Sequence, residues 1–216
     1  MTLSQRMPPL TSEAWTPEMR SVFTMLEGPD AYETGSKSNV ILTLARNPKL
    51  ASAFFKFNAG LLMRGGIAPA LRELMILRVA WLHRARYEWA QHVRVSLMPD
   101  ALSPEATEAF RRGDPLVEDG PGLLTRAQIE AVKQGAGHPV WTELEALVLR
   151  AVDELKDTSR IGDPTWAGLS RHLDEQQLIE LVFVIGSYSL LAYVMNTLDI
   201  EPEPAQQEFL EPHFDR

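Results

Sequence analysis

The 216-residue sequence contains no cysteine, and this absence limits its chemistry more than any other feature of its composition. A chain without thiols forms no disulfide, has no thiolate nucleophile, and holds neither an iron–sulfur cluster nor a cysteine-ligated zinc ion. Any catalysis must therefore come from carboxylates, histidine, tyrosine, serine or a bound cofactor.

Basic residues are also scarce relative to acids. The chain has 21 Lys and Arg against 29 Asp and Glu, which gives a formal net charge of -8. Proteins that bind the phosphate backbone of nucleic acids need a basic patch. The composition therefore predicts no nucleic-acid partner.

We expect no targeting signal or membrane anchor in this sequence. The first nine residues contain one arginine and two consecutive prolines but no apolar run, so they do not resemble a signal or transit peptide, and we expect a cytoplasmic protein. The stretch Leu178–Leu198 approaches membrane-spanning length, but it contains Glu180 and Asn196 and is flanked by Asp174 and Asp199. We interpret it as a helix buried in the core or in a subunit interface, and we expect no membrane partner.

The apolar residues that are present, 45% of the chain, fall largely at helical spacing. Runs in which Val, Ile and Thr alternate strictly with polar residues, which are typical of strands, are missing. A chain of this length folded as one body buries about 70% of the surface that it exposes when unfolded, enough for a large core. The sequence therefore predicts one all-α domain over residues 1–216, with a core at about 39–198 and arms at 1–15 and 201–216.

Helix starts are marked by a side-chain oxygen that caps the free amides, often followed by proline where no amide is needed. Pairs of this kind are Thr16-Pro17, Asn47-Pro48, Ser103-Pro104 and Asp163-Pro164. Capping boxes are predicted for Thr125 with Gln128, Thr142 with Glu145, and Asp174 with Gln177. Between the helices, Gly65-Gly66 predicts a break and Gly113–Gly122 a linker.

The segment Leu71–Val95 carries the candidate chemistry. On its first helix, Glu73 shares a face with apolar residues, and a buried carboxylate is unfavourable unless it is partnered or neutral. On its second helix, Glu88 and His92 are four residues apart and therefore lie on one face. If the helices form an antiparallel hairpin, Glu73 reaches the same cavity. Two carboxylates that flank one imidazole make a proton-transfer set.

Simpler interpretations of these residues stay open. A Glu and a His four residues apart are common on solvated helix faces, and Glu73 can pair with Arg78 or Arg94 inside the fold. Glu88 and His92 also have the right offset for two metal ligands. The motif His-Glu-x-x-His is absent, however, and the other histidines lie in unrelated contexts, so we predict no metal site.

The string from Arg72-Glu73-Leu74 to Ala80-Trp81, followed by Tyr87-Glu88-Trp89-x-x-His92, resembles the carboxymuconolactone decarboxylase family, which shares its fold with alkylhydroperoxidase D. The specific match covers about Leu71–Val95, and the helix order extends the resemblance to Asn39–Leu198. The resemblance implies an all-α bundle of packed helices that forms a homo-oligomer, commonly a trimer or hexamer, with its site near a subunit interface.

The resembled family contains two chemistries. Its peroxidase branch uses a Cys-x-x-Cys pair with a Glu and a His, and alignment of Glu73 and His92 places the two cysteine positions at Ala85 and Glu88. Neither residue forms a thiolate, so a Cys-dependent peroxidase is excluded. The decarboxylase branch resembles this chain in its Tyr-Glu-Trp before the histidine. The resemblance thus implies a carbon–carbon lyase that decarboxylates a small carboxylated lactone or a related enolisable acid by acid–base catalysis, without metal or organic cofactor.

In the corresponding mechanism, His92 is the general acid and donates a proton to carbon after loss of CO₂. Either Glu88 or Glu73 holds the tautomer of the imidazole, and the other carboxylate orients or activates the substrate. The candidate substrate-binding residues are Tyr87, Trp89, Trp81, Tyr188 and Asn196. Ordinary packing is the alternative role for each of these five side chains.

Two other functional classes remain open at this point. One histidine and two carboxylates also suit an isomerase or a hydrolase, because both need proton relocation or water activation. The second class is a catalytically degenerate relative that only binds a ligand or oligomerises through its apolar helix. Convergence of Glu73, Glu88 and His92 on one pocket would favour an enzyme.

Overall fold

The computed structural model describes residues 6–98, 122–211 and 214, and all regular secondary structure within them is helical. The predicted helix start at Ser103 and nearly all of the predicted linker Gly113–Gly122 lie outside these residues. The α-helices are α1 (Pro17–Glu27), α2 (Ala31–Thr34), α3 (Asn39–Leu44), α4 (Pro48–Arg64), α5 (Pro69–Leu82), α6 (Arg86–Leu97), α8 (Arg126–Val132), α9 (Glu143–Thr158), α10 (Asp163–Leu169) and α11 (Glu175–Leu198).

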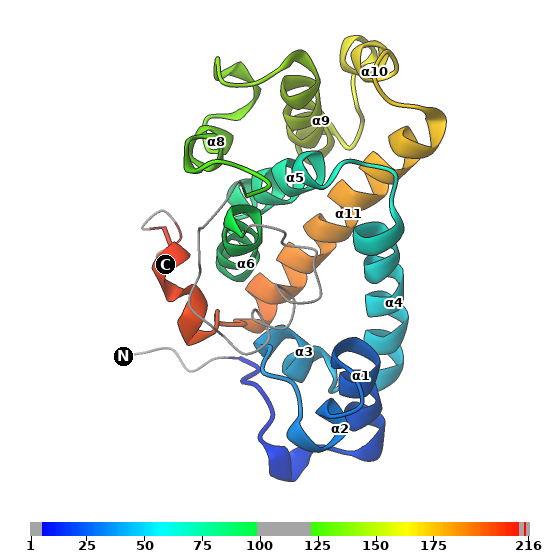
Figure 1. Cartoon of the computed structure of the whole chain (residues 1–216), viewed down its shortest axis with the longest axis vertical. Helices are drawn as coiled ribbons and strands as arrows, with labels where there is room; N and C mark the ends of the chain where they lie inside the picture. Colours follow the sequence, from blue (N-terminus) through cyan, green and yellow to red (C-terminus); the bar gives the residue numbers. More distant parts are fainter. Residues whose placement is uncertain (1–5, 99–121, 212–213, 215–216) are drawn as a thin grey trace.

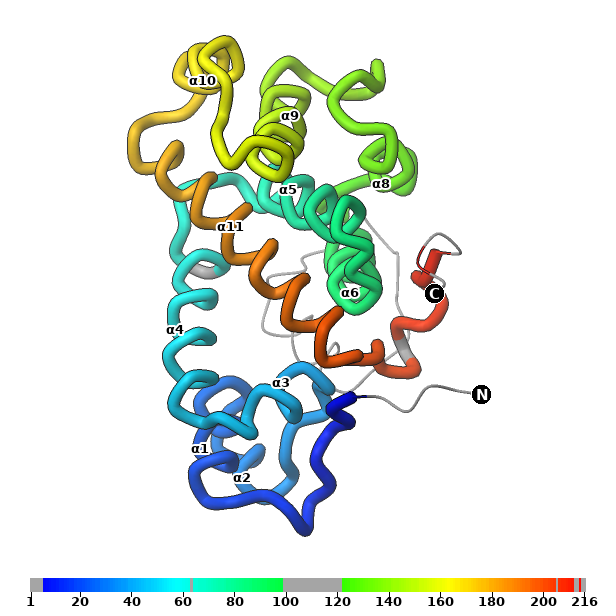
Figure 2. The backbone as a smooth tube through the Cα atoms, turned by 180° about the vertical axis from the view of Figure 1, so that it is seen from behind, coloured from blue at the N-terminus to red at the C-terminus, as the bar shows by residue number. Residues whose placement is uncertain are grey.

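The long helix α11 crosses the molecule diagonally, with α1, α2 and α3 at one end and α8, α9 and α10 at the other (Figure 1). Seen from behind, α4 lies on one side of α11 and α6 on the other (Figure 2). Between these layers, α5 packs against α6, α9 and α11. The helices α5, α6 and α11 therefore form the centre of the fold.

Local capping chemistry determines where the helices begin. Thr125, Thr142 and Asp174 each form the predicted capping box, in which the cap side chain accepts from a backbone amide and the later Gln or Glu accepts from the cap amide. Thr16 and Asn47 cap α1 and α4 through their side chains, also as predicted. The prediction at Asp163-Pro164 was wrong by one residue, because Gly162 is the cap and Asp163 is the first residue of α10.

The interior of the fold is built around α5, in which all nine residues from Arg72 to Ala80 are buried. A helix covered on every side must satisfy its polar side chains inside the protein. Arg78 does so with an ion pair of 2.7 Å to Asp153 on α9 and with hydrogen bonds to the backbone carbonyls of Val132 and Lys133. Glu73, on the same helix, finds its partner on α6.

Both ends of the described chain pack against the helical body. The backbone amide of Met7 donates to the carbonyl of Leu198 at the end of α11. At the other terminus, the 3-10 helix η3 (Pro204–Phe209) lies against α6. The segments expected to be arms thus contact this chain's own core.

One helix, α11, is long and apolar enough to cross a membrane by length and composition, and half of its most apolar window is buried inside the protein. Its buried residues, such as Leu181, Val184 and Tyr188, face α5 and α6 as part of the core. Apolar side chains on its other face are exposed, including Ile179 at 59% and Phe183 at 53%. The helix is therefore only half covered by its own chain.

Candidate active site

A tight reversal between α5 and α6 brings the candidate residues together. The turn runs through His83, Arg84 and Ala85, and Arg84 takes a positive φ of 51°, which closes the turn within three residues. Because the two helices then pack side by side, Glu73 on α5 lies against the face of α6 that carries His92. The hairpin predicted from the sequence is present.

Glu73 and His92 form a direct hydrogen bond. The Nδ1 atom of His92 lies 2.8 Å from Oε2 of Glu73, and the Ser96 hydroxyl donates to the same oxygen over 3.4 Å. The side chain of Glu73 is 3% exposed and that of His92 is 15% exposed. This contact engages Nδ1 of His92 and leaves Nε2 as the ring nitrogen that Glu73 does not occupy.

Glu88 lies one helical turn before His92 on α6. It is 2% exposed, and neither of its carboxyl oxygens has a hydrogen-bond partner in the part of the chain that the structure describes. Burial, and then the charge of Glu73, raise the pKa of Glu88 well above its ordinary value. Glu88 is therefore held as a neutral carboxylic acid that has a proton to donate.

Tyr188 on α11 completes the cluster from the opposite side. Its ring meets the imidazole of His92 edge to face, with the ring centroids 5.1 Å apart. Burial, followed by the charges of Glu73 and Glu88, raises the pKa of the Tyr188 hydroxyl. The phenol thus stays protonated, and its ring fixes the plane of the imidazole.

The side chains of Glu88, His92 and Tyr188 border a cavity of about 230 Å³, which we call the His92 cavity. Its polar lining consists of Ser38, Asn58, Tyr87, Glu88, Gln91, His92 and Tyr188. Its apolar lining consists of Val40, Phe55, Leu62, Val95, Leu191 and Met195. A cavity that combines apolar side chains with convergent polar groups is typical of a small-molecule site.

Glu203, in the C-terminal segment, contacts two residues that line the His92 cavity, Tyr87 and Gln91. One carboxylate oxygen accepts from the Tyr87 hydroxyl over 2.7 Å and from the Asn39 amide over 2.6 Å, and the other accepts from Gln91 Nε2 over 2.7 Å. Burial raises the pKa of Glu203. Burial also raises the pKa of the Tyr87 hydroxyl well above its ordinary value, with the charge of Glu203 as the next cause. Tyr87 is thus held in place by two segments that are distant in the sequence.

Three candidate substrate-binding residues do not line the His92 cavity. Trp81 and Trp89 pack against each other with ring centroids 5.4 Å apart, within a separate core cluster that includes Phe214. Asn196 donates from Nδ2 to the carbonyl of His83 over 2.8 Å and borders a different cavity of about 330 Å³. The structure thus brings Tyr87 and Tyr188 to the site and places these three elsewhere.

Several residues at the site were missed by sequence reasoning. Asn58 on α4 lines the His92 cavity and accepts from the Ser187 hydroxyl over 3.2 Å. Ser38 and Gln91 also line this cavity, and Glu203 accepts hydrogen bonds from two of its lining residues, Tyr87 and Gln91. Only Gln91 lies inside the recognised segment, so only Gln91 had a local signal, namely its place between Glu88 and His92.

The arrangement can hold and move protons. Among the residues that the structure describes, no group of three or more His, Asp and Glu side chains is placed to hold a metal ion. What the site offers is an oriented imidazole, a neutral carboxylic acid and a buried phenol around one small cavity. Such groups donate protons to, and accept them from, a substrate that carries its own electron sink.

Comparisons with known proteins agree with this helical arrangement. Residues 48–120 match the model of the carboxymuconolactone decarboxylase family. A peroxidase-related protein with an alkylhydroperoxidase AhpD core from Ralstonia eutropha is 17% identical with a TM-score of 0.65, over 97% of this chain and 96% of that one. The debrominase Bmp8, solved as a cysteine-to-alanine variant with 2,3,4-tribromopyrrole, is 20% identical with a TM-score of 0.64, over 97% and 96% of the two chains.

A putative antioxidant defence protein AhpD from Agrobacterium tumefaciens gives a TM-score of 0.57 at 15% identity, over 74% of this chain and 94% of that one. At these identities the likeness establishes a shared AhpD-like fold. Proteins with curated descriptions give no match.

Proposed function

We propose that the chain is a cofactor-independent carbon–carbon lyase that decarboxylates a small carboxylated lactone or a related enolisable acid, on the chemistry of its site and on the match of residues 48–120 to the carboxymuconolactone decarboxylase family. The observation that carries the proposal is the 2.8 Å contact between Glu73 and His92 at a cavity that the neutral acid Glu88 also lines. The chain has no cysteine, so thiol chemistry is not available to it.

The proposed reaction begins with the substrate carboxylate in the His92 cavity. The bond between the carboxylate carbon and the substrate breaks, CO₂ leaves, and the electron pair moves into a conjugated carbonyl to form an enolate. The Nε2–H of protonated His92 then delivers its proton to the carbon that lost CO₂, and the imidazole regains a proton from water. Glu73 holds Nδ1 protonated throughout, so that Nε2 faces the substrate.

Glu88 has a separate role in this mechanism. As a neutral acid without a partner among the described residues, it donates a hydrogen bond to the substrate carbonyl that becomes the enolate oxygen. A donor of this kind stabilises the transition state most, because the charge on that oxygen grows as CO₂ leaves. Sequence reasoning left both carboxylates open as the partner of His92, and the geometry favours Glu73 for that role and Glu88 for substrate activation.

Replacement of the general acid tests the proposal. We expect His92→Gln to lower the turnover of γ-carboxylated lactones or β-keto acids, followed as CO₂ release, by about 100-fold or more, because a positioned general acid contributes on this scale. The matched control is His172→Gln, at an exposed histidine between α10 and α11 that pairs only with Glu143 among the described residues. Full activity of His92→Gln would overturn the assignment.

We also propose that the chain self-associates through the N-terminal half of α11. Ile179, Val182 and Phe183 are 59%, 39% and 53% exposed, and Phe57 on α4, at 44%, meets Phe183 edge to face. A contiguous exposed apolar patch of this kind is typical of a protein interface. A second copy of the same helix supplies a complementary apolar face, which agrees with the homo-oligomers that the family resemblance implies.

A further inference from the structure

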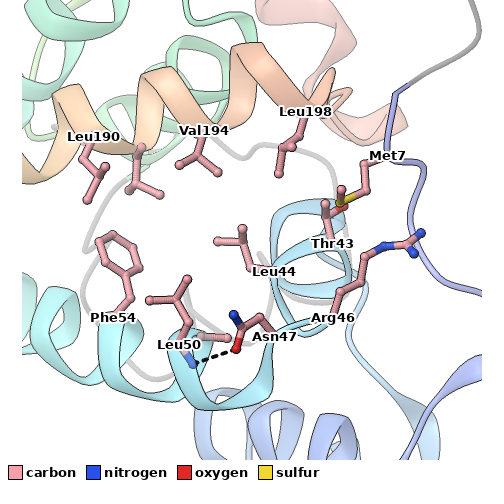
Figure 3. Close-up of a pocket in the computed structure, with 12 residues that line it drawn as sticks. Met7, Thr43, Leu44, Arg46, Asn47, Leu50, Phe54, Leu190, Val194 and Leu198 are labelled. Atoms are coloured by element: carbon pink, nitrogen blue, oxygen red, sulfur yellow. Dashed lines mark hydrogen bonds between the residues drawn. The ribbon is translucent and has the colours of Figure 1, made fainter.

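An apolar cavity lies beside the proposed catalytic site and takes no part in the proposed proton transfer. This cavity, which we call the apolar chamber, has a volume of about 440 Å³ and is formed by α3, α4, the C-terminal half of α11 and Met7. Figure 3 shows Leu190, Val194 and Leu198 pointing from α11 toward Leu44 and Phe54 on the opposite wall. Its volume falls within the range of small-molecule sites, roughly 300–1,000 Å³.

The polar side chains around the apolar chamber are few, and most are engaged in the fold. Arg46 donates from Nη2 to the carbonyl of Pro8 over 2.7 Å, and Asn47 accepts from the amide of Leu50 as the cap of α4. Thr43 is the exception, because it is 1% exposed and its hydroxyl oxygen has no hydrogen-bond partner in the described part of the chain. The apolar chamber therefore offers an apolar interior and one hydroxyl group, that of Thr43, without a partner among the described residues.

The apolar chamber and the His92 cavity lie back to back. Leu191 on α11 lines both, and it is 8% exposed. On α4, Phe54 lines the apolar chamber while the next residue, Phe55, lines the His92 cavity. The two cavities therefore share the side chain of Leu191 and adjoin each other across α4 and α11.

We propose that the apolar chamber holds an extended apolar substituent of the substrate, while the carboxylated head group lies at His92. This inference rests on the proposed function for the position of the head group. The His92 cavity, at about 230 Å³, accommodates only the reacting part of a molecule, and the adjoining chamber provides the room and the apolar surface for a tail. The substrate class is thus a carboxylic acid with a long apolar group, whose far end bears an atom that bonds to Thr43.

A binding series separates the tail from the head. The probes are straight-chain alkanoic acids of increasing length, with affinity measured by isothermal titration calorimetry. We expect the affinity to rise up to about fourfold for each added methylene until the apolar chamber is filled, since burial of one methylene contributes about 0.8 kcal/mol. Affinity that does not change with chain length would overturn the proposal.

One variant and its matched control test whether the gain in affinity per methylene depends on the apolar chamber. Leu190→Trp fills the apolar chamber from a position that is 50% exposed, so the fold tolerates it, and we expect it to abolish the gain per methylene while short acids bind as before. The matched control is Tyr193→Trp, on the same helix and 57% exposed but outside the chamber lining, which keeps the full gain. Equal behaviour of the two variants would contradict the proposal.

The outcomes also distinguish this inference from the proposed function. We expect His92→Gln to weaken binding of all chain lengths equally and to leave the gain per methylene intact. If His92→Gln keeps full turnover while the gain persists, the lyase proposal fails and the apolar site stands. If Leu190→Trp instead lowers the mass of an oligomer and chain length has no effect, a second copy occupies the chamber and the tail proposal is overturned.

Discussion

At the scale of single residues, Glu88 couples the site to the stability of the protein. Its folded-state pKa lies well above the ordinary value of 4.5, so between these two values the folded state binds more protons than the unfolded state. The stabilisation is complete below the unfolded pKa and is lost as the pH rises through the folded pKa. A glutamine at this position has the same shape and no charge to bury.

We therefore expect Glu88→Gln to remove this pH dependence. The difference in unfolding free energy should grow in favour of the variant as the pH rises, by up to about 1.4 kcal/mol per pH unit until the folded pKa is passed. Urea unfolding followed by circular dichroism from about pH 5 to about pH 8 measures it. Glu33→Gln, at an exposed position on α2, is the control that should track the wild type. Parallel stability curves for wild type and Glu88→Gln would show that burial does not hold Glu88 neutral.

At the scale of elements, the C-terminal segment is attached to α6 and the start of α3 by Glu203. Its carboxylate accepts hydrogen bonds from three donors, and a glutamine there would aim its amide group at one of them. Loss of such buried, charge-assisted bonds costs about 1–3 kcal/mol each. The segment should then separate from the body more often than the rest of the chain unfolds.

We expect Glu203→Gln to speed hydrogen–deuterium exchange across residues 204–209 by about tenfold or more and to leave α5 and α11 unchanged. Glu208→Gln lies on the same 3-10 helix at an exposed position, and it should have no such effect. If the two variants exchange alike, Glu203 does not hold the segment.

At the scale of the whole molecule, the exposed apolar face of α11 is the surface through which we propose that the chain self-associates. We expect Phe183→Glu to lower the molar mass measured by size-exclusion chromatography with light scattering, because a charge in an apolar interface is poorly solvated. Gln176→Glu adds the same charge at an exposed polar position of α11 and serves as the control. A monomeric wild type would contradict the proposed self-association.

Features encoded by neighbouring residues were predictable from the sequence. The three capping boxes formed as expected because each depends on a side chain and a backbone amide three residues apart. The contact of Glu73 with His92 could be predicted for a related reason, since both residues lie on one helical hairpin. Periodicity placed Glu73 on a buried face, and the short turn brought that face to α6.

Features that depend on segments distant in the sequence could not be predicted from it. Glu203 lies 116 positions from Tyr87 in the sequence, and nothing in its surroundings predicts that it meets the site. Asn196 shows the converse, because its helix reaches the site through Tyr188 but two turns later carries Asn196 to the carbonyl of His83. The sequence also did not indicate which face of α11 is exposed. Apolar residues occur all around this helix, so their periodicity does not distinguish a buried face from an exposed one.

The proton-transfer pair and most of the surrounding wall belong to different helices. Glu73 and His92 lie on the α5–α6 hairpin at the core, whereas Phe55, Asn58, Leu191 and much of the remaining lining come from α4 and α11. Mutations on α4 and α11 can therefore alter which molecules are accepted without moving the acid–base pair. In evolutionary terms, substitutions on α4 and α11 can change selectivity among relatives that keep both Glu73 and His92.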